Sequence, residues 1–239
     1  MLTTSISPEI TIALPQAGAA KRQPANAPAP SWADGPPQLF DAKEHVFCEG
    51  DPAGHVYKVE AGNVCIYKML QDGRRQVIDF AFPGDLIGLG AVGEHLTNAQ
   101  AISRTRLRPI PVKALHRAVG EDSRLGLKLL EILSYDLQAS QELIVTLGQR
   151  SAEERFASFL QALSRRNQRN GENPCEFVLP MTRTDIADFL GLTTETVSRL
   201  VTKFRNAGVI EISQCVLVKI LDHLKLAGLA GGENRTRLR

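Results

Sequence analysis

Two stripes of opposite character run along residues 194–210, TETVSRLVTKFRNAGVI. Apolar side chains recur at i, i+3, i+4 and i+7, the spacing of a helix face packed into a core: Val197, Leu200, Val201 and Phe204. A polar stripe keeps this spacing two residues out of phase, about 200° around the helix: Glu195, Ser198, Arg199 and Thr202. The pattern predicts a helix whose outer face carries short hydrogen-bonding side chains with one Glu and one Arg.

The residues before this helix predict a shorter helix joined to it by a tight turn. Thr182 and Asp185 fit a T-x-x-D capping box, which is followed by an apolar side at Ile186, Ala187, Phe189 and Leu190. Gly191 is expected to end that helix, and Thr193 to cap the next one. Two short helices joined by a glycine-containing turn form a helix-turn-helix, and residues 208–220, GVIEISQCVLVKI, are predicted to form a hairpin wing.

Residues 39–115 have a different sequence pattern, in which short β-rich segments alternate with turns. The segments are HVFCEG, HVYKVEAG, NVCIYKML, QVIDFAFPG and LRPIPV, and the turns include Asp51-Pro52 and Asp72-Gly73. Strands this short, with a turn about every ten residues, predict an antiparallel sandwich or roll.

Between these two parts, the chain from about residue 120 to residue 150 contains no proline and predicts a long helix. Its apolar positions step by 3 and 4 in alternation, the spacing of a seam between two helices: Leu130, Leu133, Leu137, Ser140, Ile144 and Leu147. The helix could instead pack on its own domain, but the seam is longer than a small roll would cover, which favours a two-fold dimer. Ser151 and Glu154 then form an S-x-x-E capping box that opens a new helix.

Four segments follow from these patterns. Residues 1–37 include a Pro/Ala-rich stretch with few large apolar side chains and are predicted to form a disordered tail. Residues 38–119 form the β-roll, residues 120–150 the dimerisation helix, and residues 151–239 the winged helix-turn-helix. The predicted fold class is therefore α+β.

Composition and charge narrow the class of protein. The net charge is only +2, but basic residues collect in the last third of the chain and at its end, ENRTRLR, which suggests a polyanion partner, although ordinary solvated surface can look similar. No apolar run approaches the roughly 20 residues that cross a bilayer, and the amino terminus lacks a secretory signal. The four cysteines are far apart, without a CxxC pair, which favours reduced thiols in a cytoplasmic protein.

The outer face of the 194–210 helix has two interpretations. Glu195 and Arg199 could simply form an i, i+4 ion pair that stabilises the helix by a few tenths of a kcal/mol. Alternatively, Arg199 donates to guanine, Glu195 accepts from cytosine, and Ser198 binds a base or phosphate. A capped helix-turn-helix presents these first turns to the major groove, which favours DNA reading. Backbone contacts are then expected from Arg183, Thr194, Thr202, Lys203 and Arg205.

Two competing chemistries have weaker support. Residues 88–93, GLGAVG, match the G-x-G-x-x-G dinucleotide motif, but only DLI precedes them as a strand, and no acid lies about 20 residues on. A glycine-rich turn in a β-roll explains the same residues. The five histidines show no metal-ligand spacing, although one of them could ligate haem in a gas sensor.

Three segments together resemble the Crp/Fnr family of bacterial transcription regulators, and its FixK/Fnr-like branch in particular: FAFPGDLIGLG (80–90), NAQAISRTRLRPIPVKAL (98–115) and TRTDIADFLGLTTETVSRLVTKFRNAGVI (182–210). The resemblance covers about residues 38–226. It implies a homodimer with a cyclic-nucleotide-binding-type roll and a C-terminal winged helix. It assigns base reading to Glu195, Ser198 and Arg199 on a TTGAT-type palindrome, and contact with RNA polymerase to the turn at residues 84–92.

Departures from the family pattern indicate which effector ligands or cofactors the protein does not use. Leu89 stands where cAMP-binding relatives carry a ribose-binding Glu, and their phosphate-neutralising Arg-Ser/Thr pair falls near His95 and Leu96. A buried phosphate without its Arg would be strongly penalised, so we expect no cAMP binding. The chain has no cysteine before Cys48, so we also expect no iron–sulfur cluster of the Fnr type. What remains resembles FixK-type regulators, and this resemblance implies a cofactor-free activator of low-oxygen or nitrogen-fixation genes. The alternatives are a sensor that needs a cyclic nucleotide or haem, and an NAD-dependent oxidoreductase.

Overall fold

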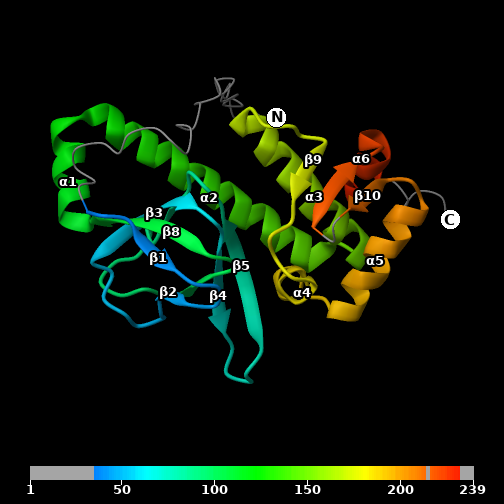
Figure 1. Cartoon of the computed structure of the whole chain (residues 1–239), viewed down its shortest axis with the longest axis horizontal. Coiled ribbons are helices and arrows are strands. Elements are labelled where there is room, and N and C mark those ends of the chain that lie inside the picture. Colours follow the sequence, from blue (N-terminus) through cyan, green and yellow to red (C-terminus); the bar gives the residue numbers. More distant parts are fainter. Residues whose placement is uncertain (1–34, 214–215, 232–239) are drawn as a thin grey trace, which may run out of the picture.

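The computed structural model describes residues 35–213 and 216–231. The predicted tail at residues 1–37 lies almost entirely outside them, as do Cys215 and the whole basic C-terminal end, ENRTRLR. Figure 1 shows a β-rich lobe beside a helical lobe, with one long helix running along the first lobe toward the second.

Two antiparallel four-stranded sheets form the N-terminal lobe. Their orders are β1-β8-β3-β6 and β2-β7-β4-β5. The strands are β1 (Gln38–Phe40), β2 (His45–Phe47), β3 (His55–Ala61), β4 (Val64–Met69), β5 (Arg75–Ala81), β6 (Leu86–Ile87), β7 (Asn98–Ala101) and β8 (Thr105–Pro111). Because alternate side chains point to one face, each strand contributes to a shared core that includes Phe47, Val59, Val64 and Leu107. This is the predicted antiparallel roll.

A close approach of two chain segments requires glycine at the turn between β3 and β4. Gly62 has φ +79°, and a Cβ there would lie 2.5 Å from Oγ1 of Thr105. The Thr105 hydroxyl donates in turn to the carbonyl of Asn63 at 3.1 Å. This arrangement holds the start of β4 against β8 and so brings the two sheets together.

Two helices follow the roll, α1 (Val112–Glu121) and α2 (Ser123–Gln149). Asp122 ends the first and caps the second by accepting from the backbone N–H of Arg124. The 27 residues of α2 give a rod about 40 Å long. One side of α2 packs on the roll through Leu125 and Leu129, while a second side leaves large apolar residues exposed: Leu127, Leu130, Leu133, Leu137, Ile144 and Val145.

The C-terminal lobe combines four helices with a three-stranded sheet of order β10-β11-β9. Its elements are α3 (Ala152–Asn170), β9 (Glu176–Val178), α4 (Arg183–Leu190), α5 (Thr194–Asn206), β10 (Ile210–Ser213), β11 (Leu217–Ile220) and α6 (His223–Gly231). Its core is built around Phe156, Leu160, Ile186 and Phe204. The rings of Phe156 and Phe204 meet edge to face, with centroids 5.3 Å apart.

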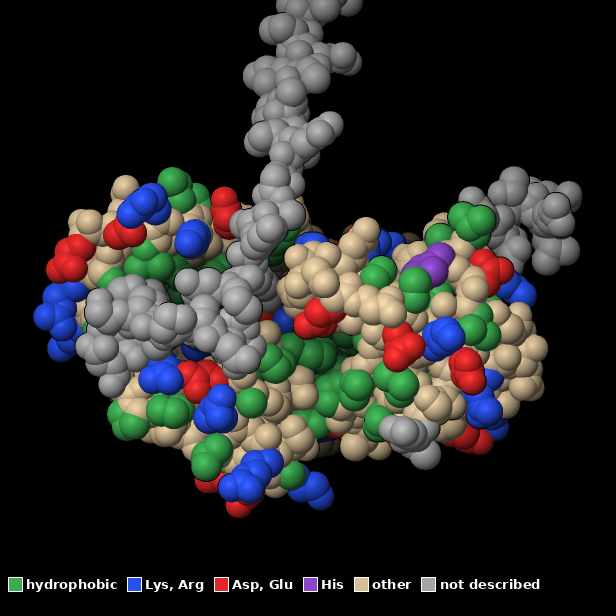
Figure 2. All heavy atoms as spheres, turned by 45° about the horizontal axis from the view of Figure 1, so that its top comes forward, with side chains coloured by type: hydrophobic (Ala, Val, Ile, Leu, Met, Phe, Trp, Pro, Cys, Tyr) green, Lys and Arg blue, Asp and Glu red, His purple; other side chains and the backbone are tan. Residues whose placement is uncertain are grey.

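The local signals in the sequence correspond closely to these elements. Both predicted capping boxes are present, at Ser151/Glu154 and at Thr182/Asp185. Five elements were missed: β1, β7, β9, α1 and α6. In the part of the chain that the structure describes, no helix is long and apolar enough to span a membrane. Figure 2 shows basic and acidic side chains interspersed over both lobes of the face it draws, with hydrophobic side chains gathered between the lobes.

Candidate nucleic-acid interface

The turn between α4 and α5 is fixed by its capping residues. Gly191 adopts the left-handed conformation at φ 62° and ends α4, and its N–H donates to the carbonyl of Ala187. Thr193 then caps α5 by accepting from the N–H of Thr196 at 3.2 Å. These residues set the angle between the two helices of a helix-turn-helix.

Helix α5 divides into the two faces that its sequence predicts. Val197, Leu200, Val201 and Phe204 are buried in the lobe core. On the other side, all four residues of the polar stripe are exposed: Glu195, Ser198, Arg199 and Thr202. The core therefore holds α5 with its polar face directed to solvent, as a helix that enters a DNA groove requires.

The side chains on this face are paired locally in the free protein. Arg199 forms an i, i+4 ion pair with Glu195, and the two side chains remain 76% and 73% exposed. A pair this exposed contributes little to stability, so both groups can exchange it for base edges at small cost. Ser198 and Thr202 donate to the carbonyls of Thr194 and Ser198, respectively, which leaves their oxygen lone pairs open to a donor.

The residues predicted to contact the DNA backbone lie on α5 and at the start of α4. Thr194 and Arg205 are exposed at the two ends of α5, and Arg183 is half-buried at the first residue of α4. Lys203 is exposed but forms an ion pair with Glu153 of α3. A phosphate contact from Lys203 would therefore compete with Glu153, a charge that the sequence pattern did not place nearby.

Two supporting side chains were not foreseen from the sequence. Arg155 donates to the carbonyls of Leu147, Arg150 and Leu190, at 2.7, 2.9 and 3.0 Å. It thereby joins the end of α2 to the end of α4, where the helix dipoles favour a cation. Lys225 of α6 donates at 2.8 Å to the carbonyl of Ala207, at the carboxyl end of α5. The position of Arg155 directly after a capping box is only a weak sequence signal for a structural role. The sequence around Lys225 gave no signal of its contact with α5.

The glycine motif at residues 88–93 does not form a dinucleotide site. It lies in the loop after the two-residue strand β6, and the next helix, α1, begins only at Val112. The loop has no helix amino terminus to receive a pyrophosphate. Gly88, at φ +79°, is required instead by packing, because a Cβ there would lie 3.1 Å from the His95 ring. The oxidoreductase interpretation is therefore wrong.

The described cysteines have different environments. Cys65 is buried, and Cys48 and Cys175 are half-buried. Burial raises the pKa of the Cys65 thiol to about 12, and the nearby Arg75 only partly opposes this shift. Because the thiolate is the reactive form, we expect Cys65 to resist iodoacetamide at pH 8 in the native protein and to react after denaturation. Peptide mass spectrometry tests this, and rapid native labelling of Cys65 would contradict it.

Two family models match the chain. The first, the cyclic nucleotide-binding domain, matches residues 37–122, and the second, the Crp-like helix-turn-helix domain, matches residues 154–229. The matched ranges correspond to the β-roll and to the lobe that carries α4 and α5.

Curated proteins and solved structures agree with these models. The chain is 34% identical to electron transport regulator A of Shewanella oneidensis, over 81% of this chain and 78% of that protein. It is 35% identical to the fumarate and nitrate reduction regulatory protein of Escherichia coli K12, over 78% of this chain and 75% of that protein. The structure of FixK2 from Bradyrhizobium japonicum superposes with a TM-score of 0.75 at 34% identity, covering 81% of this chain and 96% of that one.

The fold and the matched models define the class as a DNA-binding transcription regulator built from a roll, a long helix and a helix-turn-helix. The chain belongs to the Crp/Fnr family, with FixK2 and the fumarate and nitrate reduction regulators among its relatives. The protein is a regulator rather than an enzyme, as the sequence predicted.

Proposed function

We propose that the protein binds a TTGAT-type palindrome as a homodimer and reads it through Glu195, Ser198 and Arg199. The observation that carries this proposal is the exposed polar face of α5, held outward by a capped helix-turn-helix. In this proposal, contacts to the phosphates come from five residues of α4 and α5: Arg183, Thr194, Thr202, Lys203 and Arg205.

The exposed apolar side of α2 supports the homodimer. Leu130, Leu137 and Ile144 are 60%, 60% and 70% exposed, so each leaves most of its surface in water. Burying such a stripe against a second copy of α2 is favourable at roughly 25 cal/mol per Å². Leu133 and Leu147 complete the predicted seam; Leu133 also borders a cavity toward the roll, and Leu147 is half-buried. Two such subunits would place their recognition helices about 34 Å apart, one DNA turn.

A cofactor-free mode of action is part of the proposal. The two positions that the family uses for a cyclic nucleotide carry Leu89 and His95. The His95 ring is buried and stacks on Phe47, with centroids 3.7 Å apart and the rings 8° from parallel. Burial lowers the pKa of His95, although Asp51 opposes the shift, so the ring is a poor partner for a phosphate. These residues do not fit cAMP.

The named relatives support a role in respiration-linked gene control. They include proteins named as anaerobic, electron transport, and fumarate and nitrate reduction regulators. We propose an activator of low-oxygen or nitrogen-fixation genes that works in the cytoplasm and contacts RNA polymerase through residues 84–92. Val92 in this turn is 94% exposed, which suits a protein contact.

An effector-dependent sensor is the second candidate. A cavity of about 510 Å³ lies between the roll and α2 and is lined by residues of both. Its size is that of a small-molecule site. In the parts of the chain that the structure describes, no group of three or more His, Cys, Asp or Glu is placed to hold a metal ion.

Footprinting of purified, ligand-free protein on a TTGAT-type palindrome tests the proposal. We expect protection of both half-sites without added nucleotide, and an affinity that falls steeply with salt because phosphates are contacted. Protection that appears only with a cyclic nucleotide, or a Soret band in the purified protein, would favour the sensor. Equal binding to scrambled DNA would reject sequence reading.

The buried His95 ring predicts an acid-sensitive fold. Because its folded pKa is lowered, the unfolded chain takes up the proton at higher pH than the folded protein. The stability contributed by the neutral His95 ring is therefore fully present above the unfolded pKa of about 6.5. It is lost as the pH falls from there through the lower pKa of the folded protein. We expect the Tm of the wild type to fall more between pH 7.5 and pH 5.5 than that of His95→Gln. Parallel thermal-melting profiles would contradict this role for His95.

A further inference from the structure

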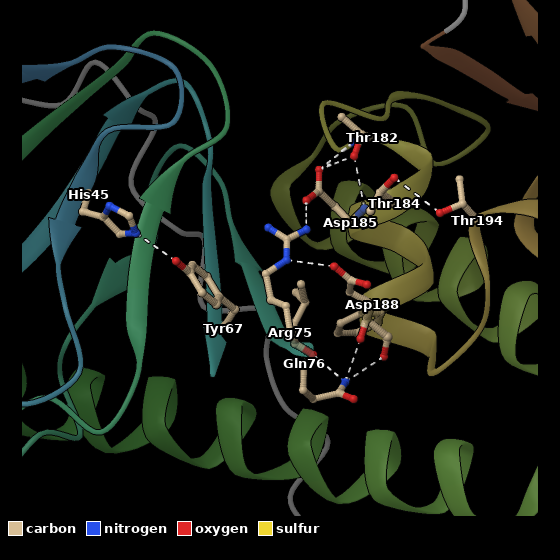
Figure 3. A network of polar contacts seen from close by, with 11 residues as sticks. His45, Tyr67, Arg75, Gln76, Thr182, Thr184, Asp185, Asp188 and Thr194 are labelled. Carbon is tan, nitrogen blue, oxygen red and sulfur yellow. Dashed lines mark hydrogen bonds and ion pairs between the residues drawn. The ribbon is translucent and has the colours of Figure 1, made fainter. Parts of the chain in front are cut away.

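An arginine on the roll binds two carboxylates of the helix-turn-helix. Arg75, at the start of β5, donates from Nε to Oδ2 of Asp188 at 2.8 Å, and its Nη2 pairs with Asp185. Both aspartates belong to α4, more than a hundred residues further along the chain. Figure 3 shows the guanidinium directed from the roll toward the two carboxylates. This three-residue cluster is called the Arg75 clamp below.

The neighbouring residue adds contacts to the helix backbone. Gln76 donates from Nε2 to the carbonyl of Asp188 at 2.9 Å and to that of Phe189 at 3.4 Å, near the end of α4 (Figure 3). These carbonyls belong to the last turn of a helix, which has no intrahelical partners for them. Two consecutive residues of β5 therefore hold α4 by its side chains and by its carboxyl end.

An apolar layer lies beside the polar contacts. Phe80 of β5 packs against Phe159 of α3 and Phe189 of α4, with ring centroids 6.5 and 5.4 Å apart. Phe159 and Phe189 also meet, at 5.6 Å. The clamp is thus the polar edge of a packed interface between the two lobes, and its contacts are held in place by that packing.

The clamp is connected to the recognition helix through α4. Asp185 also accepts from the backbone N–H of Thr182 in the capping box. The Thr184 hydroxyl lies 3.4 Å from the hydroxyl of Thr194, the first residue of α5 (Figure 3). Since the short turn at Gly191 fixes α5 relative to α4, a displacement of α4 must carry α5 with it.

The energetics favour a positioning role over a stabilising one. The side chains of Arg75, Asp185 and Asp188 are only 24%, 13% and 25% exposed, so forming the clamp costs desolvation that offsets much of its attraction. Ion pairs of this kind select one geometry, because a bidentate guanidinium fits its carboxylates in few orientations. Burial opposes ionisation of both groups. Hydrogen bonds from Thr182, and after them the one from Arg75, nevertheless lower the pKa of Asp185, and hydrogen bonds to Asp188 and Asp185 raise the pKa of Arg75. Both therefore stay charged at neutral pH.

From this geometry we infer that Arg75 is a positioning residue for DNA binding: it locks α4 against the roll and thereby sets the distance between the two recognition helices of the dimer. The inference rests on the proposed function, in which two copies of α5 read two half-sites. The polar face of α5 is exposed while the clamp is formed, so the clamped arrangement is compatible with DNA reading.

The experiment measures affinity against half-site spacing. The palindrome selected by the wild type is altered by inserting or deleting one or two base pairs at its centre. For Arg75→Gln we expect about a tenfold loss on the original spacing, less than a twofold change on scrambled DNA, and a flatter dependence on spacing. Asp188→Asn should show a smaller loss in the same direction, and it leaves the capping carboxylate of Asp185 intact.

A neighbouring arginine offers a matched control. Arg74 has a side chain that is 77% exposed and pairs with Asp72 within the turn between β4 and β5, so Arg74→Gln should bind as the wild type does. A spin label at the exposed Asn206, introduced through an unnatural amino acid, should give a broader inter-subunit distance distribution in Arg75→Gln. Unchanged binding and distances, or tighter binding by Arg75→Gln, would overturn the inference. Failure of the wild type itself to bind any palindrome would instead reject the proposed function.

Discussion

Replacing Arg199 with alanine should weaken binding to the palindrome by about 1–3 kcal/mol, roughly five- to 150-fold. The reason is geometric: Arg199 lies in the early part of α5, on its exposed face, where a guanidinium can donate two hydrogen bonds to one guanine. The loss should be selective, because the contacted base pair is the only one whose recognition disappears. Competition gel shifts against palindromes changed at one base pair at a time measure both effects.

Two variants separate base reading from charge in the Arg199→Ala experiment. Arg117 of α1 is exposed, in the lobe opposite the helix-turn-helix, so Arg117→Ala removes the same charge and should leave specific binding nearly unchanged. Lys203→Ala removes a predicted phosphate contact and should weaken specific and scrambled DNA alike. If Arg199→Ala behaves like Lys203→Ala, Arg199 reads no base. Its ion pair with Glu195 would then only stabilise helix α5.

The recognition helix could be predicted because its determinants are local. Capping by Thr193, the stop at Gly191 and the 3–4 spacing of buried residues all lie within one short stretch of chain. The same holds for the predicted roll, whose turns and alternating strands repeat about every ten residues. Each of these features follows from the conformational preferences of neighbouring residues, without knowledge of what packs against them.

Contacts between the lobes could not be predicted in this way. Arg74 and Arg75 are adjacent and chemically identical, yet one is exposed beside Asp72 and the other pairs with two aspartates of α4. Which arginine faces α4 depends on the strand register and on how the lobes dock. The partners of Arg155 depend in the same way on where α2 and α4 end. Such long-range pairings carry no periodic signal in a single sequence.

The missed helices have local explanations. Helix α1 begins directly after Pro109 and Pro111, which read as the end of a strand, and its ten residues bury only Leu115 and Ala118. Helix α6 contains two glycines, which lower helix propensity by about 1 kcal/mol each relative to alanine. Packing of Leu226 and Ala230 into the lobe core offsets that penalty. In both cases tertiary burial overrides a weak local preference.

A substitution in the predicted seam of α2 should have a large effect on dimerisation and on DNA affinity. Leu137→Glu should convert the protein to a monomer, because each dimer would bury two carboxylates close to its two-fold axis, with no cation assigned to either. Loss of the second half-site removes the avidity of two linked modules, so palindrome affinity should fall by a factor of 10² or more. Leu137 is preferable to Leu133, which also borders the cavity toward the roll.

A control on the same turn makes the seam experiment specific. Gln138 is exposed and lies about 100° around the helix from Leu137. Gln138→Glu adds the same charge and should leave the protein dimeric in analytical ultracentrifugation. If Leu137→Glu also sediments as a dimer, the exposed stripe of α2 is not the subunit interface. If the Leu137→Glu monomer still binds one half-site as tightly as the wild type binds two, dimerisation does not provide the affinity. Only a monomer that binds the palindrome weakly, beside a dimeric control, agrees with paired recognition helices joined through α2.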